Sequence, residues 1–209
     1  MNTTLSTGAI LVDAVEAARA DSIEFDDWHG NDHLGALGRL LPGALERRYA
    51  SAPRACMTSI FELGVNAPAT AQGLSIERAT APAARGHERF MAYPLSTQHR
   101  PQANNWIEAP IAYPVFFAVP PQEAGEFNDW YEQEHLGILF GCASWLACRR
   151  FQIAGAHPKG WTHLALHYLA DASALRSPER TAARSTPWRD RLALRPWFKG
   201  DYRVLHRLA

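Results

Sequence analysis

Residues 24–35 read EFDDWHGNDHLG, and residues 126–137 read EFNDWYEQEHLG. The two stretches are identical at seven of their twelve positions, and they lie 102 residues apart. The same offset places the pair Arg47-Arg48 onto the pair Arg149-Arg150. Similarity at a fixed offset is the sequence signature of a repeated structural unit. We therefore expect this chain of 209 residues to contain one unit twice.

Each half predicts the same order of elements around its copy of the repeated stretch. The repeated stretch has apolar residues at helical spacing, such as Phe25, Trp28 and Leu37 in the first copy. The expected order is strand, helix, strand, strand, helix, strand, which is the split β-α-β unit. In the first half these elements cover 9–15, 24–41, 44–50, 56–63, 67–80 and 88–94. In the second half they cover 111–119, 123–141, 145–152, 161–169, 171–194 and 201–207.

The two copies are expected to pair with each other. A four-stranded antiparallel sheet with both helices on one face leaves its other face bare, and packing two sheets face to face buries both. We predict an α+β chain in which two ferredoxin-like repeats pack sheet to sheet as an intrachain α/β barrel. Repeat 1 covers residues 1–94, a polar linker covers 95–109, and repeat 2 covers 110–209. A ligand cavity is expected between the two sheets.

Composition favours an ordinary globular protein. Hydrophobic residues make up 47% of the chain and charged residues 20%, which provides enough apolar material for a core. The formal net charge is zero, so nothing indicates binding to nucleic acid or to an anionic membrane. The sequence shows no secretory signal and no apolar run long enough to span a bilayer. Cys56, Cys142 and Cys148 form no CxxC pair, which favours free thiols in the cytoplasm.

The second copy resembles a known family. EFNDWYEQEHLG, followed by an apolar segment and CRRF at 148–151, is similar to the helix-and-strand signature of EthD-like and related dimeric α/β-barrel proteins. The most specific part is Trp-Tyr-x-x-Glu-His at 130–135, and residues 185–189, STPWR, resemble a late Thr-Pro-Trp stretch of such proteins. Gly35 and Gly137 stand where the family usually has proline.

The resemblance implies the fold more than an activity. The superfamily includes cofactor-free polyketide cyclases, muconolactone-type isomerases, decarboxylating and dehydrating enzymes, antibiotic monooxygenases and haem proteins. A shared fold does not determine function, so the site has to be argued from individual residues.

Four histidines are the candidate catalytic residues: His33, His135, His163 and His167. On a helical wheel His33 falls within the apolar arc of its helix, and His135 has the same place in the second copy. Alternation along 161–169 places His163 and His167 on one face of a strand. We expect the leucine face of this strand to pack on the helices and the histidine face to line the cavity. Asp32 and Glu134 immediately precede His33 and His135 and could orient or charge them, or they could cap the helix at the surface. The alternatives for the histidines are structural roles with bonds to backbone or carboxylate groups, or a solvent-exposed strand face.

Six further residues are candidate substrate contacts: Tyr113, Tyr131, Trp145, Arg149, Trp161 and His29. Aromatic side chains can form the wall of a pocket for a flat ligand, although most are simply core residues. An inward arginine could bind a carboxylate or phenolate, and the alternative is an ion pair across the sheet. His29 and His33 are four residues apart and could share a metal, but no third ligand has a recognisable spacing, so no metal site is predicted.

These features predict a lyase or isomerase that needs no cofactor. It would use histidine acid–base chemistry on a small apolar, oxygenated substrate of aromatic or polyketide-like type, as in the catabolism of aromatic compounds. One alternative is a protein that binds a small molecule without catalysis, and another is a haem-dependent protein with an axial histidine. The sequence leaves open whether two such barrels associate as a homodimer.

Overall fold

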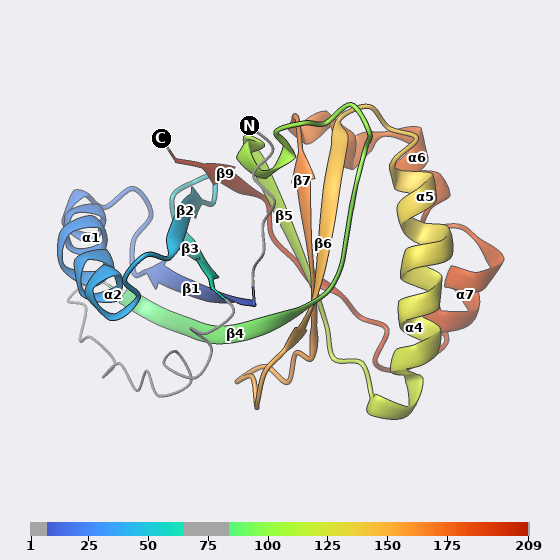
Figure 1. Cartoon of the computed structure of the whole chain (residues 1–209), viewed down its shortest axis with the longest axis horizontal. Coiled ribbons are helices and arrows are strands. Elements are labelled where there is room, and N and C mark those ends of the chain that lie inside the picture. The colour runs from blue at the N-terminus through green and yellow to red at the C-terminus, as the bar shows by residue number, and fades with distance from the viewer. Residues whose placement is uncertain (1–7, 65–83, 209) are drawn as a thin grey trace. The chain divides into compact units, whose positions relative to one another are not determined.

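The computed structural model describes residues 8–64 and 84–208. They group into two units, one formed by residues 1–94 with 205–209 and one formed by residues 95–204 (Figure 1). The helix predicted at 67–80 lies outside the described residues. None of the helices in the described ranges is long and apolar enough to cross a membrane.

Unit 1 is an antiparallel sheet with the strand order β4-β1-β3-β2-β9. Its strands are β1 (Ala9–Ala17), β2 (Leu45–Ala50), β3 (Cys56–Leu63), β9 (Leu205–Arg207) and the part of β4 (Ala84–His99) that lies before residue 95. The chain between β1 and β2 forms one continuous helical segment, which consists of α1 (Ile23–Asp27), η1 (Trp28–His33) and α2 (Leu34–Leu40). Ser22 begins this segment, because its Oγ accepts a hydrogen bond from the Phe25 amide.

Unit 2 shows the full β-α-β-β-α-β order, and its sheet has the strand order β6-β7-β5-β8. Its strands are β5 (Ile111–Phe117), β6 (Trp145–Ile153), β7 (His163–Leu169) and β8 (Asp201–Tyr202). Its first helical segment contains η3 (Pro121–Glu123), α4 (Ala124–Trp130), η4 (Tyr131–His135) and α5 (Leu136–Leu139). Its remaining helices are η2 (Trp106–Glu108), η5 (Ala172–Arg176), α6 (Pro178–Ala182) and α7 (Pro187–Ala193). The α+β class predicted from the sequence is confirmed.

The repeated stretch forms the same irregular helix in both units. In each unit an α-helical turn widens into a π-helical turn, η1 or η4, and this turn ends at the shared histidine, His33 or His135. Insertions of this kind shift the faces of the flanking helical turns relative to each other, and they are frequent at functional sites. The side chains of these two turns are therefore candidates for a functional site.

The predicted linker and the predicted last strand differ from the structure. Strand β4 continues to His99, so that residues 95–99 of the predicted linker are strand. The strand predicted at 201–207 is two short strands: β8 pairs with β5, and β9 pairs with β2 at the edge of the unit 1 sheet. Residues 205–209 therefore group with unit 1 and not with the second repeat. The open edge of β2 explains the change, because an unpaired strand edge binds another strand readily.

The helices of unit 2 cover the face of β7 that carries the histidines. Helices α4 and α5 run along one side of the sheet, with α6 and α7 on the same side (Figure 1). The ring of Phe127 in α4 lies 5.5 Å from the ring of His163, and the hydroxyl of Tyr131 in η4 bonds to His167. The expectation that the leucine face packs on the helices was wrong. Alternation separates the two faces of a strand but does not say which one the helices cover.

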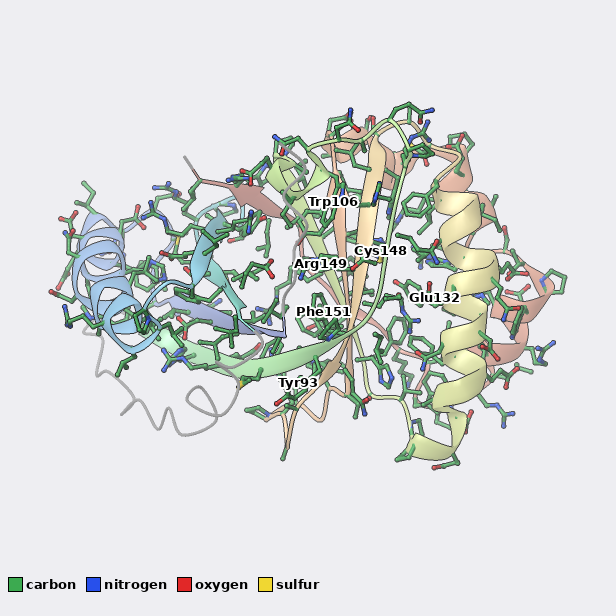
Figure 2. All side chains as sticks on the ribbon, in the orientation of Figure 1. Tyr93, Trp106, Glu132, Cys148, Arg149 and Phe151 are labelled. Carbon is green, nitrogen blue, oxygen red and sulfur yellow. The ribbon has the colours of Figure 1, made fainter. Side chains whose placement is uncertain are left out.

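The two faces of β6 also have different neighbours. Arg150 extends to the helices and pairs with Glu132 of η4 at 2.8 Å, while Arg149 lies over the ring of Phe151 at 4.9 Å. Figure 2 shows Arg149 and Phe151 on one side of β6 and Glu132 on the other. In unit 2 the second arginine of the repeated pair, Arg150, therefore faces the helices.

The core of unit 2 predicts a sharp contrast between two leucines. Leu136 is fully buried between helix and sheet, whereas Leu194 is 84% exposed. Leu136→Ala should lower the free energy of unfolding by roughly 2–5 kcal/mol, because it leaves a cavity in the core. Leu194→Ala should change it by less than about 0.5 kcal/mol. Urea unfolding of both variants measures the difference, and equal effects would show that this core is wrongly described.

Candidate functional site

A cavity of about 210 Å³ lies inside unit 2. Strands β5, β6 and β7 form one wall, the first helical segment forms another, and residues from α6 onward form the rest. The walls are largely aromatic: Tyr113, Phe117, Trp130, Tyr131, Trp145, Phe198 and Tyr202. The polar groups on the walls are His135, His167, Arg180, Arg184 and Arg189. The arrangement is that of a pocket for a small aromatic molecule with a few placed polar contacts.

His167 is the centre of a buried chain of hydrogen bonds. Trp145 donates from Nε1 to His167 Nδ1 at 3.0 Å, and His167 Nε2 lies 2.9 Å from the hydroxyl oxygen of Tyr131. The indole group can only donate, so Nδ1 must accept and the ring proton of neutral His167 must be on Nε2. His167 therefore donates to Tyr131, and the hydroxyl proton of Tyr131 is directed to another acceptor.

Burial keeps both groups of this chain uncharged. The pKa of His167 lies well below its ordinary value because of burial and then the charges of His135, Arg150 and Arg180. Burial also raises the pKa of Tyr131 well above its ordinary value. At neutral pH the pair is a neutral imidazole and a protonated phenol, so Tyr131 serves as a hydrogen-bond donor.

His135 supplies a second neutral imidazole to the cavity wall. Its Nδ1 donates to the carbonyl oxygen of Ala183 at 3.2 Å, which leaves Nε2 as the nitrogen with the lone pair. Its ring lies against Trp130, with centroids 4.6 Å apart, and next to Tyr131 at 4.9 Å. Burial lowers the pKa of His135 to about 4. At neutral pH this residue can therefore accept a proton but has none to give from Nε2.

The ion pair between Arg150 and Glu132 fixes the position of Tyr131. The guanidinium of Arg150 lies 4.5 Å from the centre of the Tyr131 ring, and it pairs with Glu132 at 2.8 Å. Ser96 and Gln98 also donate to the carboxylate of Glu132. These contacts fix the position of the phenol, since a cation over an aromatic ring is attracted to its face.

The structure brings five of the predicted site residues together in this cavity: Tyr113, Tyr131, His135, Trp145 and His167. The other five lie elsewhere. His163 is buried beside Phe127, with Nδ1 2.9 Å from the Thr162 hydroxyl oxygen. Burial lowers the pKa of His163 to about 4, but this residue is not part of the cavity wall described above.

The remaining predictions separate by face and by unit. Arg149 lies on the face of β6 opposite the helices, and Trp161 lies near Phe116 with ring centroids 6.4 Å apart. His29 and His33 belong to unit 1. Sequence reasoning missed the three arginines of the cavity, which come from the second helical segment, where the two halves of the sequence are least alike.

Unit 1 contains a separate buried polar cluster around Asp13, which is fully buried in β1. His33 donates from Nε2 to one carboxylate oxygen at 2.6 Å, and His87 donates from Nε2 to the other at 2.7 Å. Arg89 donates to the second oxygen at 2.6 Å. These contacts hold the pKa of Asp13 well below its usual range despite its burial. Sequence reasoning missed Asp13 as the partner of His33. The signal for it was a charged residue inside the apolar run AILVDAV.

The carboxylates predicted to orient the helix histidines have other roles. Asp32 is exposed, and His33 bonds to Asp13 instead. Glu134 accepts a hydrogen bond from Thr186, the residue that caps α7. Neighbours in sequence on a helix lie about 100° apart around its axis, so the carboxylate and the histidine that follows it do not face each other.

Asp13, His33 and His87 are also the residues that could hold a metal ion, because their ligand atoms lie within 4.8 Å of one another. Arg89 already places a cation on the same carboxylate, which opposes a second cation there. The neighbouring His29 is buried, and neither of its ring nitrogens has a partner within the described ranges. Burial lowers the pKa of His29 to about 4.

The two units differ at the position that Asp13 occupies. Asp13 pairs with Ser59 on β3, and Val115 pairs with Ala165 on β7 in the matching register. In unit 1 the aspartate therefore bonds to the helix histidine, while in unit 2 the valine lines the cavity beside His135. Loss of the carboxylate leaves the second histidine available to a ligand.

Comparison with known proteins identifies the fold. No family model matches the chain, and no curated protein matches its sequence. Solved structures do match: an anthrone oxidase-like protein superposes with a TM-score of 0.66 at 10% identity, over 98% of this chain and 93% of the other. A mutant chlorite dismutase from Candidatus Nitrospira defluvii gives 0.63 at 9% identity, over 100% and 95%.

A third similar structure is a putative monooxygenase from Fusobacterium nucleatum, with a TM-score of 0.56 at 11% identity, over 97% of this chain and 94% of the other. A further match from Listeria monocytogenes is described as a ferredoxin fold protein related to antibiotic biosynthesis monooxygenases. At such low identities the likeness shows the fold alone. The chain is thus an α+β protein of the ferredoxin fold with an aromatic cavity in its second unit.

The Asp13 cluster predicts a strong effect of one substitution. Asp13→Asn removes the charge that balances Arg89 inside unit 1, and loss of one partner of a buried ion pair costs roughly 3–5 kcal/mol. Asp32→Asn is the matched control, because Asp32 is exposed and should change stability by less than about 0.5 kcal/mol. Chemical unfolding decides the question. A stable Asp13→Asn protein would contradict the description of this cluster.

The buried histidines predict that stability falls in mild acid. His29, His135 and His163 have pKa values of about 4 in the folded chain, against 6.5 as the ordinary value. Between pH 6.5 and 4 the unfolded chain binds more protons than the folded chain, so the free energy of unfolding should decrease as the pH falls through this range. Urea unfolding at several pH values measures the slope. A flat profile would mean that these histidines are protonated in the folded protein.

Proposed function

We propose that the chain is an enzyme without a dissociable cofactor, which acts as a lyase or isomerase by proton transfer on a small, oxygenated aromatic molecule. The observation that carries the proposal is a neutral His135 whose ring lies 4.9 Å from the ring of Tyr131, a phenol whose hydroxyl already accepts a hydrogen bond from His167. A base and a hydrogen-bond donor on the wall of one aromatic cavity are the two parts that proton abstraction next to a carbonyl requires.

In this mechanism His135 is the base. Its Nε2 takes a proton from a carbon adjacent to the substrate carbonyl, and the Ala183 carbonyl stabilises the resulting imidazolium through Nδ1. The electron pair of the broken C–H bond forms a carbon–carbon double bond, and the π pair of the carbonyl moves to its oxygen, which gives an enolate. Return of the proton to a different carbon completes an isomerisation, and departure of a leaving group at the next carbon completes an elimination.

Tyr131 stabilises the enolate oxygen. Its hydroxyl donates to the oxygen on which charge develops, and the bond from His167 increases its acidity as a donor. The aromatic walls exclude water, which strengthens each of these interactions. Because Trp145 fixes the proton of His167 on Nε2, the donor geometry exists before the substrate binds.

Similarity to other proteins supports an aromatic substrate. The signature at 126–137 resembles that of EthD-like proteins, and one structure with the same fold is described as anthrone oxidase-like. Anthrone is an aromatic ketone, and a molecule of that kind suits the aromatic walls of this cavity. The free thiols Cys56, Cys142 and Cys148 support a reducing compartment such as the cytoplasm.

Binding without turnover is the second candidate function. The pKa of about 4 makes His135 a weak base at rest, and such a base removes only an activated proton. A protein with this cavity would bind an aromatic ligand even if no bond in that ligand reacted.

A haem fits this cavity poorly, although one structure of the same fold is described as a heme-degrading enzyme from Listeria monocytogenes. His135 Nε2 is a suitable axial ligand, since Nδ1 is bonded to a carbonyl. The volume of about 210 Å³ is nevertheless below the range of about 300–1,000 Å³ that is typical for ligands of drug size. No step of the mechanism therefore involves haem.

The proposal predicts the behaviour of three variants in one assay. The probe is 2-tetralone, a small aromatic ketone, and the measurement is exchange of its acidic C–H for deuterium in D₂O by NMR. His135→Gln should slow exchange by about 10²- to 10⁴-fold, since it removes the base. Tyr131→Phe should slow it by about 10²-fold or more, since it removes the donor to the enolate.

His163→Gln is the matched control, because His163 is a buried histidine outside the cavity wall. It should leave exchange within about threefold of the unmodified rate, with folding checked by circular dichroism. Exchange that equals the buffer rate, or an equal loss in all three variants, would exclude the proposed mechanism. Binding of 2-tetralone without exchange, seen by quenching of tryptophan fluorescence, would select the second candidate function.

A further inference from the structure

Three arginines give the cavity of unit 2 a positive side. Arg180 comes from α6, Arg184 follows that helix, and Arg189 comes from α7. No residue among those that line the described cavity carries a carboxylate. The walls are otherwise aromatic, aliphatic or neutral at neutral pH, so the arginines determine the sign of the local potential.

These arginines are poorly neutralised by the protein. The guanidinium of Arg180 donates to the Leu175 carbonyl at 2.9 Å and to the Tyr113 hydroxyl at 3.3 Å, and both partners are neutral. The side chain of Arg184 has no hydrogen-bond or ion-pair partner in the part of the chain that the structure describes. Arg189 reaches Asp190 only at 3.5 Å, on the exposed side.

Two arginines of unit 2 that lie outside the cavity have close carboxylate partners. Arg150 pairs with Glu132 at 2.8 Å, and Arg191 pairs with Glu126 at 3.0 Å. Arg191 and Arg189 belong to the same helix, yet the one outside the cavity has a carboxylate partner at short distance. Arg150 and Arg191 thus have carboxylate partners at short distance, and among the described residues the three arginines of the cavity do not.

Trp130 supplies an independent observation. It is only 2% exposed, it lines the same cavity, and its Nε1 has no hydrogen-bond partner among the described residues. A buried N–H group without a partner is unfavourable, and such groups are rare in native proteins. An oxygen atom of a bound ligand would satisfy it. The wall therefore presents both positive charge and an unused donor to a ligand.

We infer that the ligand of this cavity is an aromatic molecule with an anionic oxygen, a carboxylate or a phenolate, which binds to Arg184 and Arg189 at the α6–α7 side. This inference rests on the proposed function for its location, since it names the substrate class of the same cavity. The ring would lie among the aromatic walls, and the anion would supply the charge that the lining residues lack. Arg180, which is held by Leu175 and Tyr113, positions the phenol of Tyr113 next to the ligand.

The experiment compares ligands of the same shape and different charge. Binding of 2-naphthoate and of the neutral 2-naphthamide to the full chain is measured by isothermal titration calorimetry. We expect 2-naphthoate to bind at least about tenfold more tightly, because hydrogen bonds to charged groups are the stronger ones. A third ligand, 4-nitrophenolate above its pKa, shows whether a phenolate is accepted as well as a carboxylate. Equal binding of the acid and the amide, or no binding of either anion, would overturn the inference.

Matched variants locate the anion. Arg184→Gln should remove most of the preference for 2-naphthoate over 2-naphthamide, and Arg191→Gln should keep it, because Arg191 lies outside the cavity. Arg184 is exposed, so its substitution should not disturb folding, and Arg189→Gln is the second variant. Equal effects of the Arg184 and Arg191 substitutions would indicate only general charge attraction and contradict the assigned site. The anion preference is measured without turnover, so it can hold even if the proton-exchange assay fails.

Discussion

The unit 2 cavity depends on two hydrogen bonds to one histidine, from Trp145 Nε1 to His167 Nδ1 and from His167 Nε2 to Tyr131. They join β6, β7 and η4 across the interface between sheet and helix. A buried imidazole is unfavourable unless both nitrogens have partners, and here both do. The same two bonds fix the tautomer and direct the Tyr131 hydroxyl to a further acceptor, while burial keeps His167 neutral. Packing and chemistry are thus set by the same contacts.

The shared helix histidine has different hydrogen-bond partners in the two units. In unit 1, His33 meets the carboxylate of Asp13, which also binds His87 and Arg89, so the polar groups satisfy one another. In unit 2 a valine stands at the position of Asp13, and His135 bonds only to a backbone carbonyl. One unit therefore closes its polar cluster, while the other keeps a nitrogen lone pair at a cavity. Such a difference fits one working site and one supporting unit.

Much of the fold could be predicted because it depends on local patterns. The repeat at 24–35 and 126–137, with helical spacing and flanking strands, was enough for the β-α-β-β-α-β order seen in full in unit 2. The orientation of β7 was not accessible, because alternation defines two faces but cannot say which one meets the helices. The end of the chain was misassigned for a similar reason. The pairing of β9 with β2 depends on an open strand edge far away in sequence.

The site was predicted in part. Tyr131, His135 and His167 came from the repeated signature and from strand alternation, and the structure places all three on one cavity. The arginines at 180, 184 and 189 were not predicted, because the second helical segment is the part where the two halves are least alike and arginine is common on exposed helices. Asp13 could have been found, since a charged residue within an apolar strand needs a buried partner.

The proposed pairing of base and donor depends on the protonation state of His135 and His167, which nitrogen NMR of the imidazole rings measures directly. We predict that His167 carries its proton on Nε2 and His135 on Nδ1, and that neither ring titrates between pH 8 and 5. A His167 ring protonated on Nδ1, or a His135 that becomes charged near pH 6.5, would contradict the proposed pairing of base and donor.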